Sequence, residues 1–387
     1  MTRIIFINTY PLYSRKILQY DPGKDDFFLF GMGRFIAEES YKRNYPVKFE
    51  IWRMDLRITA KMEKEINGIF CRIFPSKEYP ILNEFSYDLY RELVKIKNED
   101  NVVLHFMGVH SHQYNLYAFA ARNLTIIATH LGGQNPLYKL REEKNKVSYV
   151  SYFLEKYFFL RFYDHFVSMS AVEIDYFKKM NKSAVHSPIF GIPNLYLLNI
   201  QDRTQCRKSL NLPLDKKIIL QIGRANENRG FQWILEILKE NNYPNNWEFV
   251  FAGIHKEDEY YNELVATGLH ITGYSSTKEL NLYYNAADVL IYLPNGKMDL
   301  NFAGTSYVPI EALACGTPVV ATTFHHFPGS EVKEISRIPR TKDDVVPMIS
   351  SLLSEKVARK YCRAIAIRYF SWDNILEMYM NLYFPSN

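Results

Sequence analysis

The chain has 387 residues, of which 47% are hydrophobic and 23% are charged, with a net charge of +5. These proportions exclude a disordered or collagen-like chain, and the length exceeds the size at which a single core usually divides, so we expect two domains. No apolar run reaches the ~20 residues of a membrane span or resembles a signal-peptide core, which predicts a cytoplasmic protein.

Residues 1–195 are predicted to form a Rossmann-like α/β domain, because strand-length apolar runs alternate there with helical segments. The expected strands are 3–8, 48–53, 102–106, 125–129 and 165–169. His130 follows the fourth strand, and Gly23 lies in a Pro-Gly-Lys turn after the first. His130 has two open interpretations: a ligand-binding imidazole, or an ordinary strand-end residue satisfied by a neighbour.

A basic stretch, residues 139–146, precedes an aromatic stretch, residues 147–163. The spacing of the aromatic residues favours a buried interdomain or core helix. The alternative is a peripheral surface for anionic lipid headgroups or polyanionic glycans, since residues 1–200 hold 27 Lys and Arg against 21 Asp and Glu. Nucleic acid is not an expected partner, because no zinc, RNP-type or helix-turn-helix signature accompanies the charge.

Residues 196–368 are predicted to form a second doubly wound parallel sheet, with strands at 217–222, 247–252, 270–274, 288–293 and 319–323. Gly223, Arg224 and Arg229 lie on the loop between the first of these strands and its helix. Two cations on a short loop at a helix N-terminus can converge on one diphosphate. The alternative is a solvated loop with two unrelated arginines.

A second loop-helix segment follows about ninety residues downstream. Gly304, Thr305 and Ser306 precede its helix and offer backbone N–H groups to an anion. Glu311 lies about one and a half turns inside the helix, where its carboxylate can accept two hydrogen bonds from vicinal hydroxyls. A diphosphate site and a diol site together indicate a nucleotide.

These residues resemble the donor-binding half of GT-B glycosyltransferases, in particular the retaining glycosyltransferase family four, also called group 1. The similarity is collinear through stretches 223–230, 271–274, 284–289, 311–320 and 369–372. It implies an α/β protein of two Rossmann-like domains facing across a cleft, with a last helix in 369–387 that returns to the first domain. It also implies sugar transfer, with retention, from a nucleotide sugar to a glycan, lipid-linked or small-molecule acceptor, with no metal and no cofactor.

The resemblance assigns catalytic roles to Arg224 and Arg229 on the diphosphate and to His130 beside the donor sugar. It assigns donor binding to six residues: Gly23, Gly223, Gly304, Thr305, Ser306 and Glu311. Ala303 departs from the family, which has a sugar-contacting glutamate there, and Asp299 lies four residues too early to replace it. A catalytically silent glycan-binding or partner subunit is therefore the second hypothesis. A nucleotide-dependent oxidoreductase is the third, and it lacks a Gly-x-Gly-x-x-Gly fingerprint.

Overall fold

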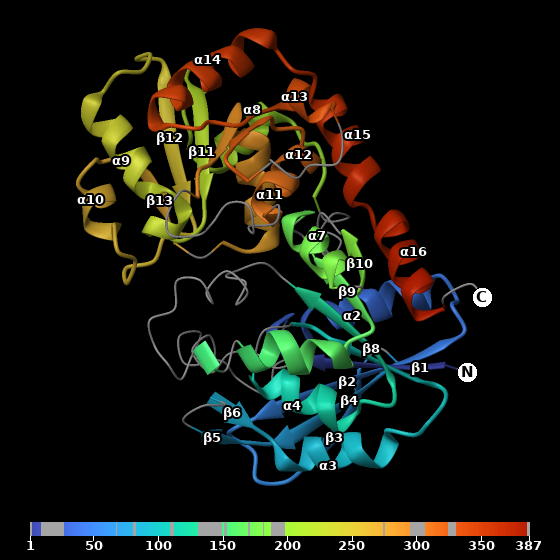
Figure 1. Ribbon diagram of the computed structural model, residues 1–387. Coiled ribbons are helices and arrows are strands. Elements are labelled where there is room, and N and C mark those ends of the chain that lie inside the picture. The colour runs from blue at the N-terminus through green and yellow to red at the C-terminus, as the bar shows by residue number, and fades with distance from the viewer. Residues whose placement is uncertain are drawn as a thin grey trace. The chain divides into compact units, whose positions relative to one another are not determined.

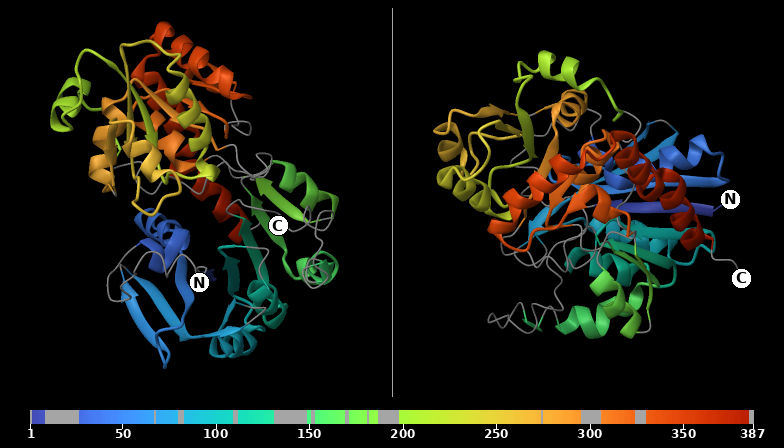
Figure 2. Two further views of the ribbon diagram at one scale, coloured as in Figure 1. Left: turned by 90° about the vertical axis from the view of Figure 1, so that its left-hand side faces the viewer. Right: turned by 90° about the horizontal axis from the view of Figure 1, so that it is seen from above.

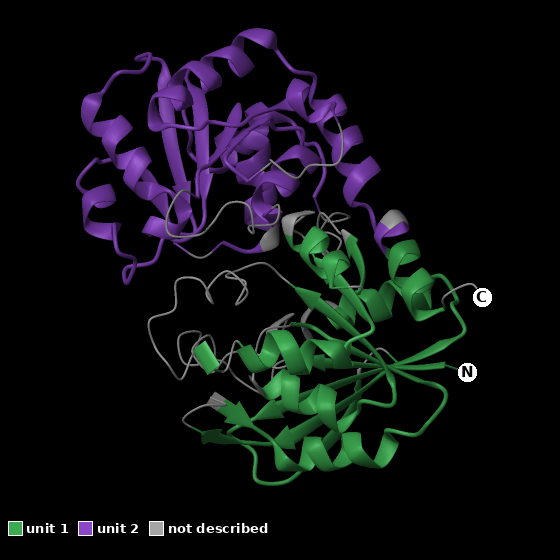
Figure 3. Cartoon of the chain, in the orientation of Figure 1, with its two compact units in different colours: residues 1–187, 376–387 green, residues 188–375 purple. Residues whose placement is uncertain are grey.

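The computed structural model describes residues 2–8, 27–66, 68–79, 83–108, 112–130, 149–150, 153–168, 171–180, 182–186, 198–273, 275–294, 306–323 and 330–384. The chain divides into two compact units (Figure 3). Unit 1 holds Met1–Ser187 together with Leu376–Asn387, and unit 2 holds Pro188–Ile375. The domain limit predicted between residues 195 and 196 falls within 187–197, outside the described residues.

Unit 1 is built on an eight-stranded sheet whose order is β10-β9-β8-β7-β1-β2-β4-β3 in the described part of the chain. Its neighbouring strands pair in parallel, except that β3 runs antiparallel to β4. The strands are β1 Thr2–Asn8, β2 Val47–Asp55, β3 Met62–Ile66, β4 Ile69–Pro75, β7 Val102–Phe106, β8 Thr125–His130, β9 His165–Ser168 and β10 Ser183–His186, beside a small ribbon of β5 Lys77–Tyr79 and β6 Asn83–Phe85. The sequence did not predict β3 to β6 or β10.

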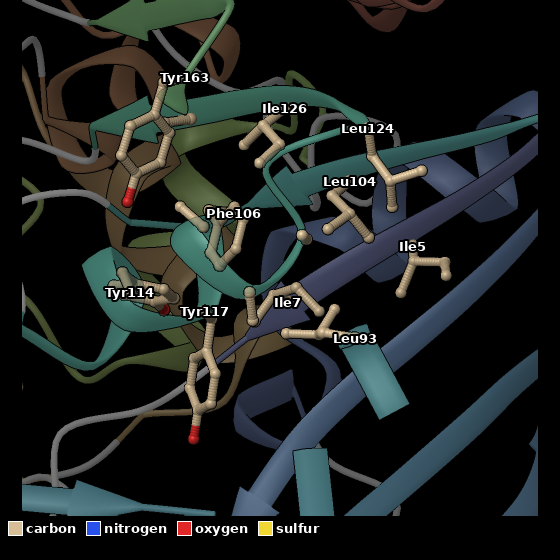
Figure 4. Packing of buried hydrophobic residues seen from close by; sticks show 14 of the residues in the cluster. Ile5, Ile7, Leu93, Leu104, Phe106, Tyr114, Tyr117, Leu124, Ile126 and Tyr163 are labelled. Carbon is tan, nitrogen blue, oxygen red and sulfur yellow. The ribbon is translucent and has the colours of Figure 1, made fainter. Parts of the chain in front are cut away.

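Helices cover both faces of this sheet (Figures 1 and 2). Alternate residues of the buried strands, such as Ile5, Leu104 and Ile126, face one layer of helices and form a core with Leu93 and Tyr117 (Figure 4). The helices of unit 1 are α2 Phe27–Lys42, α3 Tyr87–Ile96, α4 His112–Ala120 and α7 Ala171–Lys179. Because helices cover both faces of the sheet, we look for a ligand site at the carboxyl ends of the parallel strands.

The C-terminal helix α16, Trp372–Tyr383, ends in unit 1. His105 of β7 is fully buried, with Nδ1 2.7 Å from the Tyr383 hydroxyl and Nε2 2.6 Å from Thr129 Oγ1. Burial lowers the pKa of His105 to about 3, so the ring is neutral at physiological pH. A histidine with both nitrogens paired thus links β7 and β8 to the last helix.

Unit 2 contains a six-stranded parallel sheet with the order β13-β12-β11-β14-β15-β16 among the described residues. The strands are β11 Lys217–Ile222, β12 Trp247–Ala252, β13 His270–Thr272, β14 Val289–Tyr292, β15 Val319–Ala321 and β16 Ser336–Arg337. The chain moves outward from β11 to β13, then returns to place β14 on the other side of β11. This reversal creates a topological switch point between β11 and β14, which is where ligands bind in open α/β sheets.

The helices of unit 2 also form two layers (Figure 1). On one face, buried residues of α9 and α14, such as Ile234 and Ile349, pack against Ile219, Phe251 and Ile291 of the strands. The helices are α8 Arg203–Ser209, α9 Phe231–Glu240, α10 Tyr261–Val265, α11 Thr277–Ala286, α12 Tyr307–Ala314, α13 Val332–Ile335, α14 Val345–Glu355 and α15 Arg359–Phe370. Within the described ranges of both units, no helix has the length and hydropathy needed to cross a bilayer.

Candidate functional site

The loop after β11 is shaped by two glycines with positive φ. Gly223 has φ +119°, and a Cβ added there would meet no atom of the described residues within 4 Å. Gly230 has φ +74°, and a Cβ there would lie 1.7 Å from the Leu293 carbonyl oxygen. Only glycine fits such an approach. The loop therefore packs directly against the end of β14, and α9 begins at Phe231 with no side-chain cap on its first N–H groups.

Arg224 is anchored by a carboxylate from the loop after β12. Its Nε donates to Asp258 Oδ1, while Asp258 Oδ2 accepts from the backbone N–H groups of Ala225 and His255, each at 2.9 Å. Burial alone would raise the pKa of Asp258, but these hydrogen bonds hold it below its usual value. The Arg224 side chain is 41% exposed, and Nη1 and Nη2 have no protein partner among the described residues. Those two nitrogens can bind an anion bidentately.

Arg229 is held by Tyr292 at the end of β14. Its guanidinium carbon lies 5.6 Å from the centre of the Tyr292 ring, and Nη1 donates to the Tyr292 hydroxyl. Burial lowers the pKa of the Arg229 guanidinium. The contact places the second predicted cation at the switch point itself, because Tyr292 is the last residue of the strand next to β11.

Glu311 lies on α12 and is half-buried. Its Oε2 accepts a 2.7 Å hydrogen bond from the hydroxyl of Tyr284 on α11. Burial raises the pKa of Glu311, and the bond from Tyr284 lowers it in part. No described residue donates to Oε1. One carboxylate oxygen is therefore oriented by the protein while the other remains available to hydroxyl donors.

Three polar side chains near the carboxyl ends of β11 and β15 have buried atoms that lack hydrogen-bond partners in the described part of unit 2. These are Gln221, through both amide atoms, Asn226, through Oδ1, and Thr323, through Oγ1. Buried polar atoms are rarely left unpaired in native proteins, and a ligand or an ordered water is one way to satisfy them. Their position at the same edge as Arg224 and Arg229 agrees with a polar ligand there.

His130 lies in unit 1, at the carboxyl end of β8. Its Nδ1 is 2.5 Å from Oε2 of Glu173, which is fully buried on α7, and Ser168 Oγ donates to the same oxygen. A carboxylate partner fixes the orientation of an imidazole. Asn8, at the end of β1, is also buried, and its Nδ2 has no partner among the described residues. The structure thus pairs Nδ1 of His130 with a buried carboxylate.

Several predicted site residues fall outside the described residues: Gly23, Gly304 and Thr305, together with Ala303 and Asp299. Ser306 is described and occupies the position before α12, with extended φ and ψ of −74° and 155°, but its side chain makes no capping bond. Within the described ranges, no group of three His, Cys, Asp or Glu side chains has the arrangement of a metal site.

Sequence reasoning missed the residues that hold the predicted ones in place. Tyr284 falls inside a stretch that resembles the family, yet nothing in that stretch indicates its bond to Glu311. Asp258, Tyr292 and Glu173 come from other loops, strands or helices, 34, 63 and 43 residues from their partners. The order of parallel strands brings them together, and only a correct sheet order would have revealed them.

Comparison with known families finds a similarity for the second part of the chain. Residues 202–368 match the model of the family described as glycosyl transferases, group 1. The match spans less than half of the chain, and over these residues the chain is similar to group 1 glycosyl transferases. The predicted resemblance is confirmed, and Arg224, Arg229 and Glu311 all lie within the matched residues.

Relatives and solved structures agree with this family. An uncharacterized glycosyltransferase from Methanocaldococcus jannaschii is 25% identical over 202 residues, which cover 48% of this chain and 49% of the relative. The chain thus matches about half the length of that curated relative.

Sucrose-phosphate synthase from Thermosynechococcus elongatus superimposes with a TM-score of 0.66 at 18% identity, covering 99% of this chain and 98% of that one. Anabaena HepE in complex with UDP-glucose gives 0.64 at 13% identity, covering 98% and 99%. These likenesses confirm the predicted α/β fold of the GT-B class.

Proposed function

We propose that the protein transfers a sugar from a nucleoside diphosphate donor to a glycan, lipid-linked or small-molecule acceptor, with retention and without a metal ion. The observation that carries the proposal is that Arg224 and Arg229 share the loop after β11 and are anchored separately, Arg224 by Asp258 in the loop after β12 and Arg229 by Tyr292 at the end of β14. The complex of HepE with UDP-glucose makes uridine diphosphate the first nucleotide to test.

The charges at this edge suit a leaving diphosphate. When the bond between the sugar and the nucleotide breaks, negative charge grows on the departing phosphate. Arg224 is already oriented by Asp258, so its free Nη groups need little rearrangement to stabilise that charge. Arg229 adds a second cation from the far end of the same loop. Glu311 accepts a hydrogen bond from a ribose hydroxyl through Oε1, the carboxylate oxygen that is not bonded to Tyr284.

Residues of unit 1 supply the acceptor side in this proposal. His130, oriented by Glu173, bonds to the donor sugar or the incoming acceptor. The acceptor proton passes to the departing phosphate, as the family resemblance implies. We also propose that the protein works in the cytoplasm, with its basic and aromatic unit 1 at a membrane surface.

Calorimetry with UDP and a coupled assay of UDP release from nucleotide sugars, both in EDTA, test the proposal. Arg224→Ala and Arg229→Ala should each lower turnover about 10²–10³-fold, the effect of removing one preorganised donor from a developing anion. Arg340→Ala removes an exposed arginine elsewhere in unit 2 and should leave turnover unchanged. Near wild-type turnover in both site variants contradicts the diphosphate assignment. UDP binding without release from any donor instead favours the silent subunit suggested by Ala303.

A further inference from the structure

A row of large apolar side chains lies exposed on the helical segment before β9. Tyr149, Val150, Phe153, Leu154 and Tyr157, here called the aromatic face, are 45%, 55%, 46%, 45% and 61% exposed. In no other ten-residue stretch of the described chain are more than two large apolar side chains exposed. Solitary exposed apolar residues are ordinary, whereas a contiguous group marks an interaction surface. The expectation that this segment is a buried helix is therefore wrong for these residues.

The opposite side of the segment is firmly attached to unit 1. The segment includes a π-helical turn, Glu155–Phe159, and a 3-10 turn, Leu160–Phe162. Leu160 is fully buried and Glu155 is 1% exposed. The rings of Phe158 and Phe162 lie 6.3 and 5.3 Å from that of Phe119 on α4. Figure 1 shows the segment alongside α4.

Because one side is packed in this way, the exposed face is a fixed feature of the fold. The rings of Phe153 and Tyr157 lie 4.7 Å apart, which places the two aromatic side chains together on it. The segment is therefore apolar on two sides. One side packs against α4, as the aromatic spacing predicted, and the other side is the exposed aromatic face.

One cation, Lys156, lies over a ring of the aromatic face, and two others, Arg161 and Arg122, lie over rings at the side that packs against α4. Lys156 is 4.9 Å from the Tyr157 ring centre, Arg161 is 4.2 Å from that of Phe158, and Arg122 is 4.8 Å from that of Phe119. The acid within the segment, Glu155, is buried on the other side. Aromatic side chains combined with outward Lys and Arg are the composition of helices that lie in a membrane interface.

We propose that the aromatic face binds the surface of a bilayer containing anionic phospholipid. The apolar side chains enter the boundary between headgroups and acyl chains, and the cations contact the lipid phosphates. A two-fold dimer through the same face would place the positive charge beside this face from both copies in one interface, which disfavours a second copy as the occupant. The inference deepens the proposed function by assigning its membrane contact to particular residues, and its test does not require sugar transfer.

Co-sedimentation of the full chain with vesicles of phosphatidylcholine, with or without phosphatidylglycerol, tests the proposal. The wild type should bind the anionic vesicles, and binding should fall as salt rises. Leu154→Gln combined with Tyr157→Gln should weaken that binding at least tenfold. The matched control, Tyr87→Gln with Leu214→Gln, changes the same residue types at 58% and 52% exposure and should bind like the wild type.

A charge variant and a nucleotide assay complete the design. Arg161→Gln should weaken binding to anionic vesicles about fivefold, the usual contribution of one cation near an anionic surface. UDP affinity should be the same in every variant, so a loss of vesicle binding is separable from a failed nucleotide site. Three outcomes overturn the proposal: no binding by the wild type, equal losses in the Leu154/Tyr157 variant and its control, or a wild-type dimer that the Leu154/Tyr157 variant dissociates.

Discussion

The proposed role of Glu311 as a ribose ligand leads to a prediction that separates the effect of one hydrogen bond from the effect of overall charge. Glu311→Gln removes a negative charge near a bound diphosphate, which favours binding, and weakens a hydrogen bond to the ribose, which opposes it. Affinity for UDP alone mixes the two effects. The ratio of the affinities for UDP and 2′-deoxy-UDP does not, because both ligands carry the same phosphates.

The structure sets the size of the expected change. Tyr284 occupies Oε2 at 2.7 Å, so a ribose hydroxyl bonds to the remaining oxygen of a charged carboxylate. A hydrogen bond to a charged group contributes about 1.5–3 kcal/mol, so the wild type should prefer UDP about 10–150-fold. A neutral amide contributes about 0.5–1.5 kcal/mol, so Glu311→Gln should prefer UDP only about 2–12-fold.

Calorimetry with both nucleotides measures this ratio, and pH gives a second readout. Because burial raises the pKa of Glu311 above 4.5, the preference for UDP should fade at a higher pH than an ordinary carboxyl group would allow. Glu263→Gln, an exposed glutamate of α10, is the charge-matched control and should keep the wild-type ratio. An unchanged ratio in Glu311→Gln would refute the assignment and leave Glu311 as a structural partner of Tyr284.

Two further predictions concern buried polar groups. Asp258→Ala should lower the free energy of unfolding by about 2–6 kcal/mol, because two backbone N–H groups lose their acceptor. Asp258→Asn keeps an oxygen for these groups and should lower it by about 1 kcal/mol. Urea unfolding compares the two variants, and equal losses of stability would contradict the geometry. Burial lowers the pKa of His105 from 6.5 to about 3, so between these pH values the unfolded chain binds a proton that the folded chain excludes. The free energy of unfolding should therefore fall by up to about 1.4 kcal/mol for each pH unit below 6.5, and His105→Gln should flatten this dependence.

The parts of the fold that the sequence predicted are those determined by local patterns. The strands predicted at 217–222 and 247–252 are β11 and β12 with the same limits, since continuous apolar runs with turns on both sides leave little choice. The unpredicted β3 has three consecutive charged residues, Glu63, Lys64 and Glu65, and it pairs antiparallel at the edge of the sheet. Exposed edge strands of this kind carry a weaker apolar signal than central strands.

The candidate site also contains residues that local patterns predicted and residues that they did not. Arg224, Arg229 and Glu311 were predicted because short loops and one helix hold them near their own strands. Their chemistry also depends on Asp258, Tyr292 and Tyr284, which lie 34, 63 and 27 residues away along the chain.

The strand order brings the partners of both arginines close to them, because β12 and β14 flank β11. Asp258 lies in the loop after β12, and Tyr292 is the last residue of β14. An arginine that reaches an anion from an anchored position loses less side-chain entropy on binding than a free one, which costs about 0.5–1.5 kcal/mol to immobilise. The motif therefore predicts which groups contact the nucleotide, and the sheet topology determines how far those groups are already oriented for that contact.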